Sequence, residues 1–583
     1  MSWKILTLPF FLLLIMTGCQ DRATTEQTDF QVQIRLASEP DNLHPMFSRS
    51  SYSTQIENLI FYPLAEFDPY TLALQPLLIE EVPVAELIET GKYEGLYRYS
   101  LKIRDEAVWE DGTPVTANDY LFTVKVAFNP KVNAPSWRGF LDAIQAIEMD
   151  SQDARSFQVY IKGKNMISDL IVVNFAIFPA HVYDAGNLMG DITLDDLRTE
   201  VPEDTLAVWY PNLAPFAEAF TSVEYNRETI SGAGPYRFVE WVTGQSIILE
   251  KKENWWGEKV SDAPGMMRGN PYRITYTFVP DENTALSAMK DGAFDILSEV
   301  SSEAFVEMEN DPLYAGKFNF YTPSLMQFHY LELNNRDPKL ADPRVRKALA
   351  SILDYDAIID NLTAGLAVRT IGPIHPSKPY YNKQIAAPVQ DFDLARKYLD
   401  EAGWRDSNGD GTVDKVIDGK PTELDLSVMV SQRKEGQQIA LILQQNAAKV
   451  GIGIEIETRD GQQILSALRT RDFEILPMRV RSNPYLYDPY QTWHSESDKP
   501  GGSNRSGYHD KEVDEIIERI RLVEDPTEMN QLYLEFQEEL ARDQPVIFLY
   551  VPEEKIIANS RIIMKPSSRR PGYFENLFEL GPI

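Results

Sequence analysis

Leu424 to Leu476 reads LDLSVMVSQRKEGQQIALILQQNAAKVGIGIEIETRDGQQILSALRTRDFEIL. Apolar and polar residues alternate in three short segments of this stretch, as in strands, and two longer segments have the apolar spacing of amphipathic helices. The expected elements are, in order, a strand at 424–430, a helix at 435–450 ended by Gly451, a strand at 452–456, a helix around 464–468 and a strand at 473–476. Strands and helices that alternate in this way pair in parallel through right-handed crossovers. The sequence therefore predicts an α/β domain here.

The segment after the third strand is the first candidate for a ligand site. Ligands of α/β sheets bind beyond the carboxyl ends of the strands, which points to Pro477–Trp493 (PMRVRSNPYLYDPYQTW). Arg479 and Arg481 bring positive charge to this segment, so an anionic or carboxylate-bearing ligand is one option. Its aromatic side chains could stack on a sugar, fill apolar subsites or pack within the domain; they are Tyr485, Tyr487, Tyr490 and Trp493.

Shorter patterns predict elements in the rest of the chain. Residues 31–37 (QVQIRLA) and 97–103 (YRYSLKI) alternate as strands do. Thr116, with Asp119 three residues later, is typical of a helix start. Further helices are expected to begin at Asp281 and at Asp342-Pro343.

Composition limits the possible classes of protein. The 583 residues are 43% hydrophobic and 25% charged, which is typical of folded chains and rules out a largely disordered one. A chain of this length predicts several domains. The formal net charge of −32 excludes nucleic acid as a partner, because phosphate binding needs clustered lysine and arginine.

The one cysteine, Cys19, follows a short apolar segment near the N-terminus. Lys4 and the 12-residue, mainly apolar segment Ile5–Met16 have the layout of an export signal, and the segment is too short to span a membrane. Residues 16–19 (MTGC) resemble the lipobox of bacterial lipoproteins, with Met in place of the usual Leu. We therefore expect residues 1–18 to be removed, Cys19 to carry lipid and residues 19–30 to form a tether. The alternatives are an ordinary signal peptide with an incidental thiol, or an uncleaved anchor.

Motifs of common enzymes are missing from the sequence. It contains no HExxH, GxSxG or GxxxxGK[ST] motif, and no GxGxxG between an expected strand and helix. The six histidines are scattered, with no pair four residues apart. A pair of facing carboxylates, as in a glycoside hydrolase, remains the alternative that sequence alone leaves open.

One acidic segment resembles half of a calcium loop. Asp406, Asn408, Asp410 and Asp414 fit the first positions of an EF-hand loop, but Ile417 stands where the bidentate glutamate belongs. The same Asn-Gly and Asp-Gly pairs favour a turn by themselves, so a turn is the preferred interpretation and calcium the weaker one.

Short motifs are spread along most of the chain. They are RLASEPDNL (35–43), YPL (62–64), DP (68–69), WEDGTPVTAND (109–119), GAGPY (232–236), ALSAMKDGAFD (285–295), DPRVRKAL (342–349), AGW (402–404), DP (488–489), GY (507–508), VD (513–514) and QPV (544–546). In this order they resemble the extracellular solute-binding proteins of family 5, the peptide/nickel-type receptors of ABC importers. The resemblance runs from about Gln31 to Val551.

This resemblance implies an α/β, two-lobed, periplasmic-binding-protein-like fold of class II, type C, with an additional third domain. By carry-over, residues 31–67, 226–299 and 542–583 would form the first lobe, and residues 300–541 the second. Residues 68–225 would form the additional domain. The ligand would be enclosed between the lobes by hinge closure.

The resemblance also implies a ligand site between an N-terminal loop and the segment after the third strand. The implied residues are Ser38, Glu39, Pro40, Asp41, Gly234, Tyr236, Arg481, Ser482, Asn483, Tyr485, Tyr487 and Asp488. Peptide-binding members of the family have an Asp-Pro or Glu-Pro step, which corresponds to Asp488-Pro489 in this chain. Three residues before the acidic residue of that step they place an aspartate, which pairs with the peptide's α-ammonium group. Tyr485 stands there in this chain and cannot supply that charge, so Asp488 or Asn483 is the expected substitute.

The function implied is capture of a small peptide or similar solute and its delivery to ABC permease subunits. The protein is expected to be a monomer without cofactor, held by its lipid outside the cytoplasm. An oligosaccharide or other non-peptide solute is the alternative ligand. A hydrolase and a structural surface protein are the alternatives from other classes.

Overall fold

The computed structural model describes residues 30–199, 201–483, 485–499, 502–523 and 525–581. Residues 424–476 fold as predicted, into β17 (Asp425–Val430), α15 (Lys434–Ala447), β18 (Gly453–Thr458), α16 (Gly461–Thr470) and β19 (Ile475–Arg481). Strand β17 pairs in parallel with both β18 and β19. Strand β19 runs on to Arg481, so the first part of the segment expected to bind ligand lies in the sheet.

These strands belong to a six-stranded sheet in the order β14-β20-β13-β19-β17-β18. Its other strands are β13 (Gln327–Leu333), β14 (Ala367–Arg369) and β20 (Val546–Pro552). Side chains alternate across β13, so Leu331 faces one core and Tyr330 another. The helices around this sheet are α12 (Pro343–Ser351), α13 (Tyr355–Thr363), α14 (Phe392–Glu401), α15, α16, α17 (Tyr490–Trp493), α18 (Lys511–Leu522) and α19 (Pro526–Asp543). We call this body lobe II.

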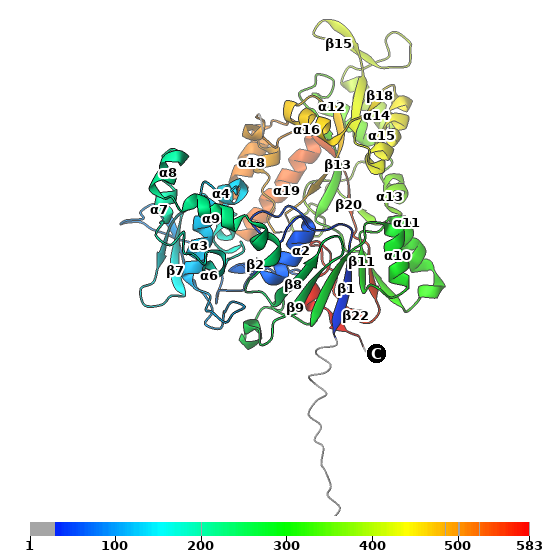
Figure 1. Cartoon of the computed structure of the whole chain (residues 1–583). Helices are drawn as coiled ribbons and strands as arrows, with labels where there is room; N and C mark the ends of the chain where they lie inside the picture. Colours follow the sequence, from blue (N-terminus) through cyan, green and yellow to red (C-terminus); the bar gives the residue numbers. More distant parts are fainter. Residues whose placement is uncertain (1–29, 200, 484, 500–501, 524, 582–583) are drawn as a thin grey trace, which may run out of the picture.

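Lobe I is built on a seven-stranded sheet. In sheet order its strands are β12 (Phe318–Tyr321), β21 (Ile556–Asn559), β11 (Ile296–Ser298), β1 (Gln31–Leu36), β10 (Arg273–Phe278), β9 (Ser246–Lys251) and β8 (Tyr236–Val242). Strand β1 is parallel to β10 and β11, and the outer pairs are antiparallel. Its helices are α2 (Ser51–Ile60), α10 (Glu282–Lys290) and α11 (Ser302–Asn310). In Figure 1, lobe II lies above this sheet, with its yellow and orange helices.

The additional domain lies beside lobe I and is drawn mainly in cyan in Figure 1. Its four-stranded antiparallel sheet has the order β4 (Glu86–Leu87), β5 (Leu96–Lys102), β7 (Ser156–Lys162) and β6 (Ile144–Met149). Its helices are α3 (Ala117–Phe128), α4 (Pro135–Leu141), α5 (Ser168–Val173), α6 (Ala180–Tyr183), α7 (Leu194–Leu197), α8 (Glu203–Trp209) and α9 (Leu213–Phe220). Tyr120 of this domain and Ile34 of lobe I belong to one hydrophobic core, so the two units pack as one body.

Within the ranges described, three further antiparallel pairs of short strands lie outside these sheets. They are β2 (Ala65–Phe67) with β3 (Leu74–Pro76), β15 (Asp414–Ile417) with β16 (Lys420–Glu423), and β22 (Ile562–Ile563) with β23 (Glu579–Leu580). The Asp406 carboxylate accepts the backbone N–H groups of Gly409 and Gly411, at 2.7 and 3.0 Å, and Asp414 accepts the hydroxyl of Ser407. These bonds are typical of an Asx-Gly turn.

At each of the two expected boundaries between the lobes, after residue 299 and after residue 541, one strand belongs to the sheet of the other lobe. Strand β12 pairs with β21 in the sheet of lobe I, although residues from 300 onward were expected in the second lobe. Strand β20 pairs with β13 and β14 in lobe II, although residues from 542 onward were expected in the first. Pairing with long-range partners sets these memberships, and no local pattern encodes it.

The expected helix starts are confirmed. Thr116 and Asp119 form a capping box at α3, while the Asp281 and Asp342 side chains cap α10 and α12. Cys19 and the export signal lie outside the described residues. Among the residues the structure describes, no helix is long and apolar enough to cross a bilayer.

Candidate ligand-binding site

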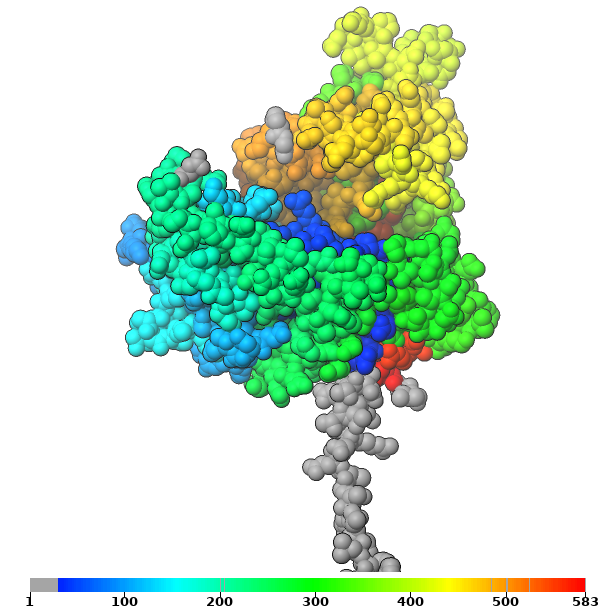
Figure 2. All heavy atoms as spheres, viewed as in Figure 1, coloured from blue at the N-terminus to red at the C-terminus, as the bar shows by residue number. Residues whose placement is uncertain are grey.

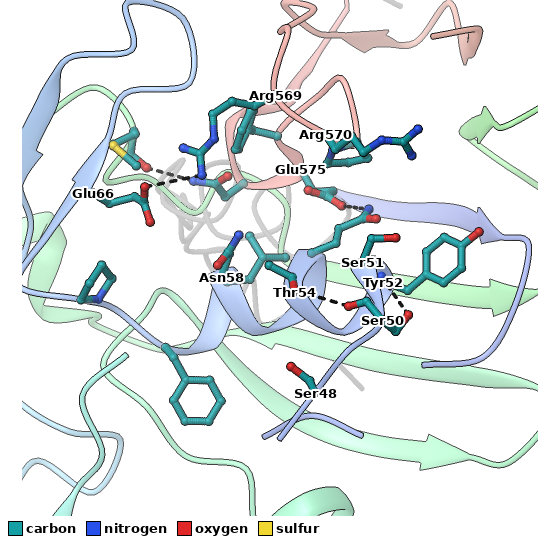
Figure 3. Close-up of a pocket in the computed structure, with 18 of the residues that line it drawn as sticks. Ser48, Ser50, Ser51, Tyr52, Thr54, Asn58, Glu66, Arg569, Arg570 and Glu575 are labelled. Atoms are coloured by element: carbon teal, nitrogen blue, oxygen red, sulfur yellow. Dashed lines mark hydrogen bonds and ion pairs between the residues drawn. The ribbon is translucent and has the colours of Figure 1, made fainter. Parts of the chain in front are cut away.

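A cavity of about 280 Å³ lies where the two lobes meet. Helix α2 and the loop before it, residues 48–59, form one side, and the C-terminal segment 569–577 forms the other (Figure 3). Arg481, at the end of β19, is the contribution of lobe II. Figure 2 shows the surface hollowed between the upper, yellow and orange body and the lower, blue and green one.

Asp41 fixes the start of α2 and so the cavity wall. Its carboxylate accepts the backbone N–H groups of Arg49 and Ser50, at 2.9 and 3.2 Å, and the hydroxyl of Ser53 at 2.7 Å. These bonds hold the pKa of Asp41 below its usual value, against the raising effect of burial. The expected ligand residue Asp41 therefore has a local partner for each carboxylate oxygen.

Four arginines and three carboxyl groups line the cavity: Arg49, Arg481, Arg569, Arg570, Glu66, Glu299 and Glu575. Arg569 pairs with Glu66 at 3.5 Å, and Arg570 approaches Glu299 at 3.7 Å. Tyr52 donates its hydroxyl to Glu299 at 2.5 Å. Burial and the nearby Arg570 guanidinium lower the pKa of Arg481. Glu299 also has a left-handed backbone conformation (φ 58°), which is uncommon outside glycine.

Glu575 is the buried carboxyl of this group. Its side chain accepts hydrogen bonds from Gln55 and, at 3.0 Å, from the hydroxyl of Tyr276. Burial raises its pKa to about 7. At neutral pH this group therefore carries only part of a negative charge, and the cavity has more positive than negative charge.

Three more of the expected site residues, Glu39, Gly234 and Tyr236, make their contacts within lobe I. Glu39 accepts the indole N–H of Trp241 at 2.6 Å and the backbone N–H of Gly244 at 3.1 Å. Gly234 donates its N–H to the Ile60 carbonyl at 2.8 Å. Tyr236 is fully buried and donates its hydroxyl to the Pro271 carbonyl. The close backbone approach expected at Gly234 is made to the end of α2.

The segment after β19 forms a contact between the lobes. The ring of Tyr485 stacks on Phe67 of lobe I, with centroids 3.4 Å apart and planes at 8°. Its hydroxyl lies 3.4 Å from Glu66, and the Arg569 guanidinium lies 5.2 Å from its ring centre. Burial, followed by the charge of Glu66, raises the pKa of Tyr485. Tyr485 therefore contacts lobe I beside the Glu66–Arg569 pair and does not itself line the cavity.

The other residues of this segment are held inside lobe II. Asp488 lies 3.4 Å from Arg521 and accepts the backbone N–H of Tyr490. Tyr487 accepts the indole N–H of Trp493 at 2.6 Å. Ser482 donates its backbone N–H to Met326, and Asn483 accepts the N–H of Tyr485. Asp488, the first expected substitute for the missing aspartate, is thus already paired.

Comparison with known proteins agrees with this architecture. The family model described as bacterial extracellular solute-binding proteins, family 5 Middle, matches residues 83–502. The chain belongs to this family. The oligopeptide-binding protein AppA of Bacillus subtilis is 25% identical over 523 residues, covering 88% of this chain and 84% of AppA. The oligopeptide-binding protein OppA of the same species is 21% identical over 612 residues and covers 99% of both chains.

Solved structures show the same fold. AppA of Bacillus subtilis, in complex with a nonapeptide, has a TM-score of 0.66 at 23% identity, covering 95% of this chain and 99% of AppA. NikA from Brucella suis, in complex with Fe(III)-EDTA, has a TM-score of 0.72 at 18% identity, covering 94% of this chain and all of NikA. The α/β two-lobed fold expected from the sequence is confirmed for this family 5 protein.

Of the expected site residues, all in the described part of the chain, Arg481 lines the cavity of this family 5 protein. Sequence reasoning missed the other wall residues, on α2 and at 569–577. The adjacent Arg569 and Arg570, in a strongly acidic chain, were the available signal. Arg479 lies two residues from Arg481 on β19 but lines a separate pocket of about 230 Å³ in lobe II.

Proposed function

We propose that this family 5 protein captures a peptide-like solute between its lobes and delivers it to the permease subunits of an ABC importer. The observation that carries the proposal is a cavity walled by both lobes, in a chain of the solute-binding family. Relatives along most of the chain are named oligopeptide-binding proteins, which supports a peptide as the solute. Extra contacts from both lobes stabilise the closed form when the solute is bound.

The protein is proposed to bind its solute without turning it over. Residues 30–581 mixed with a defined pool of penta- to nonapeptides are expected to retain some of them in native mass spectrometry. Peptides released by acid should have their original masses, because the proposed role needs no bond cleavage. Cleaved products that increase with time would contradict the role of a binding protein.

We further propose that Cys19 carries lipid and holds the protein at a membrane outside the cytoplasm. The proposal rests on residues 4–19, with their apolar segment and lipobox-like end. Cys19→Ser should move the protein from the membrane fraction to the soluble fraction or leave the signal uncleaved, whereas Ser38→Ala should fractionate as wild type does. Identical fractionation of Cys19→Ser and wild type would contradict lipidation.

A further inference from the structure

The cavity concentrates positive charge in a chain whose formal net charge is −32. Arg49, Arg481, Arg569 and Arg570 all line it. Its carboxyl groups are fewer: Glu66 pairs with Arg569, Glu299 lies beside Arg570, and Glu575 is partly neutral at pH 7. Such an excess of cations in a half-enclosed space attracts an anionic group.

Among the cavity arginines, Arg481 has a guanidinium group that is available to a ligand. Its guanidinium forms no hydrogen bond and no ion pair with any side chain in the described ranges of the chain, although Glu299 is close enough to act on its charge. Arg570 lines the same cavity as Arg481, and after burial the positive charge of Arg570 is the next cause that lowers the pKa of Arg481. Glu299 is already engaged by Arg570 and Tyr52, so one carboxylate faces two guanidinium groups.

The two arginines belong to different lobes. Arg481 ends β19 of lobe II, whereas Arg570 lies in the C-terminal segment on lobe I. Without a ligand their charges repel, and this repulsion opposes closure. A carboxylate between them would reverse the sign of that interaction, because guanidinium groups bind carboxylates with strong, directed hydrogen bonds.

We propose that Arg481 and Arg570 bind a carboxylate of the solute from opposite lobes, so that the anionic group of the solute helps to close them. This inference rests on the proposed capture of a peptide-like solute and adds a requirement to it: the solute presents a carboxylate at this point. In a peptide, that carboxylate is either the C-terminus or an acidic side chain.

The test compares Arg481→Gln with Arg479→Gln, by calorimetric titration with Ala-Ala-Glu-Ala-Ala, its C-terminal amide, its Glu→Gln analogue and the analogue that lacks both carboxylates. Arg479→Gln is the matched control, because it removes the same charge two residues away, outside the cavity. For a peptide that retains the recognised carboxylate, Arg481→Gln is expected to weaken binding about 10- to 100-fold, while Arg479→Gln changes it less than about threefold.

Removing the recognised carboxylate from the peptide should weaken binding to the wild type by the same factor as Arg481→Gln does. The Arg481→Gln variant should bind the peptides with and without that carboxylate equally. Loss with the amide identifies the C-terminus, and loss with the Gln analogue identifies an acidic side chain. Equal losses in both variants, or equal binding of all four peptides by wild type, would overturn the inference.

Failure of the proposed function gives a different result. If no peptide binds, Fe(III)-EDTA and Ni(L-His) serve as carboxylate probes. If a probe binds and Arg481→Gln weakens that binding, the carboxylate site at Arg481 is supported and a peptide as the solute is rejected. If these probes also fail to bind, or bind equally to both variants, the inference is rejected as well. Thermal unfolding of each variant checks that the fold is intact.

Discussion

Gly234→Ala is expected to lower the free energy of unfolding by about 3 kcal/mol and to weaken solute binding, because overpacking against backbone is costly. A Cβ at this position would lie 2.5 Å from the Leu59 carbonyl oxygen and 2.8 Å from that of Ile60. Both atoms belong to the last turn of α2, so the clash can be relieved only by moving the helix that walls the cavity. Denaturant unfolding measures the first effect and peptide titration the second.

Gly139→Ala is the matched control. Gly139 lies within α4 of the additional domain, and a Cβ there would meet no atom within 4 Å. Alanine in a helix is favoured over glycine, so this variant should be more stable than wild type by about 0.5–1 kcal/mol. If Gly234→Ala were as stable as Gly139→Ala, α2 would be able to shift freely. That result would contradict the tight packing of Gly234 against the helix that walls the cavity.

Tyr485→Ala is expected to open the lobes and to weaken solute binding, because the Tyr485–Phe67 stack joins lobe II to lobe I. Phe67 is 6% exposed, and the ring of Tyr485 lies flat against it. Stacked aromatic pairs contribute about 1 kcal/mol beyond the area they bury. Small-angle scattering should give the ligand-free variant a larger radius of gyration than wild type.

A double-mutant cycle isolates this contact. Phe67→Ala and Tyr485→Ala should show a coupling free energy of about 1 kcal/mol in solute binding, since the two rings touch each other. Tyr485→Phe keeps the ring and removes only the hydroxyl, so it should stay near wild type. Additive effects of the two alanine substitutions would mean that the stack contributes nothing to closure.

Local patterns in the sequence were enough to predict the α/β core of lobe II. Residues 424–476 contain the whole strand–helix–strand–helix–strand unit, and its pairing follows from its connections. The position of Arg481 followed from the carboxyl-end rule for such sheets. Strands β12 and β20 could not be assigned to a lobe, because each pairs with strands far away in the sequence.

The cavity was harder to predict for the same reason. Its two main walls, around residues 48–59 and 569–577, are separated by more than 500 residues in the sequence. The family resemblance implied that Asp41 and Gly234 contact ligand, whereas in the structure neither residue lines the cavity. Asp41 accepts hydrogen bonds from Arg49, Ser50 and Ser53 at the start of α2, and Gly234 lies against the end of the same helix. Both residues therefore shape the cavity wall from behind.

Hydrogen exchange of residues 30–581, with and without a tryptic digest of casein, tests most directly whether solute binds between the lobes. Addition of the digest is expected to protect residues 48–59 and 569–577 of lobe I together with residues 478–483 of lobe II, while the additional domain is unchanged. Protection confined to one lobe, or to the additional domain, would contradict capture of the solute at this cavity.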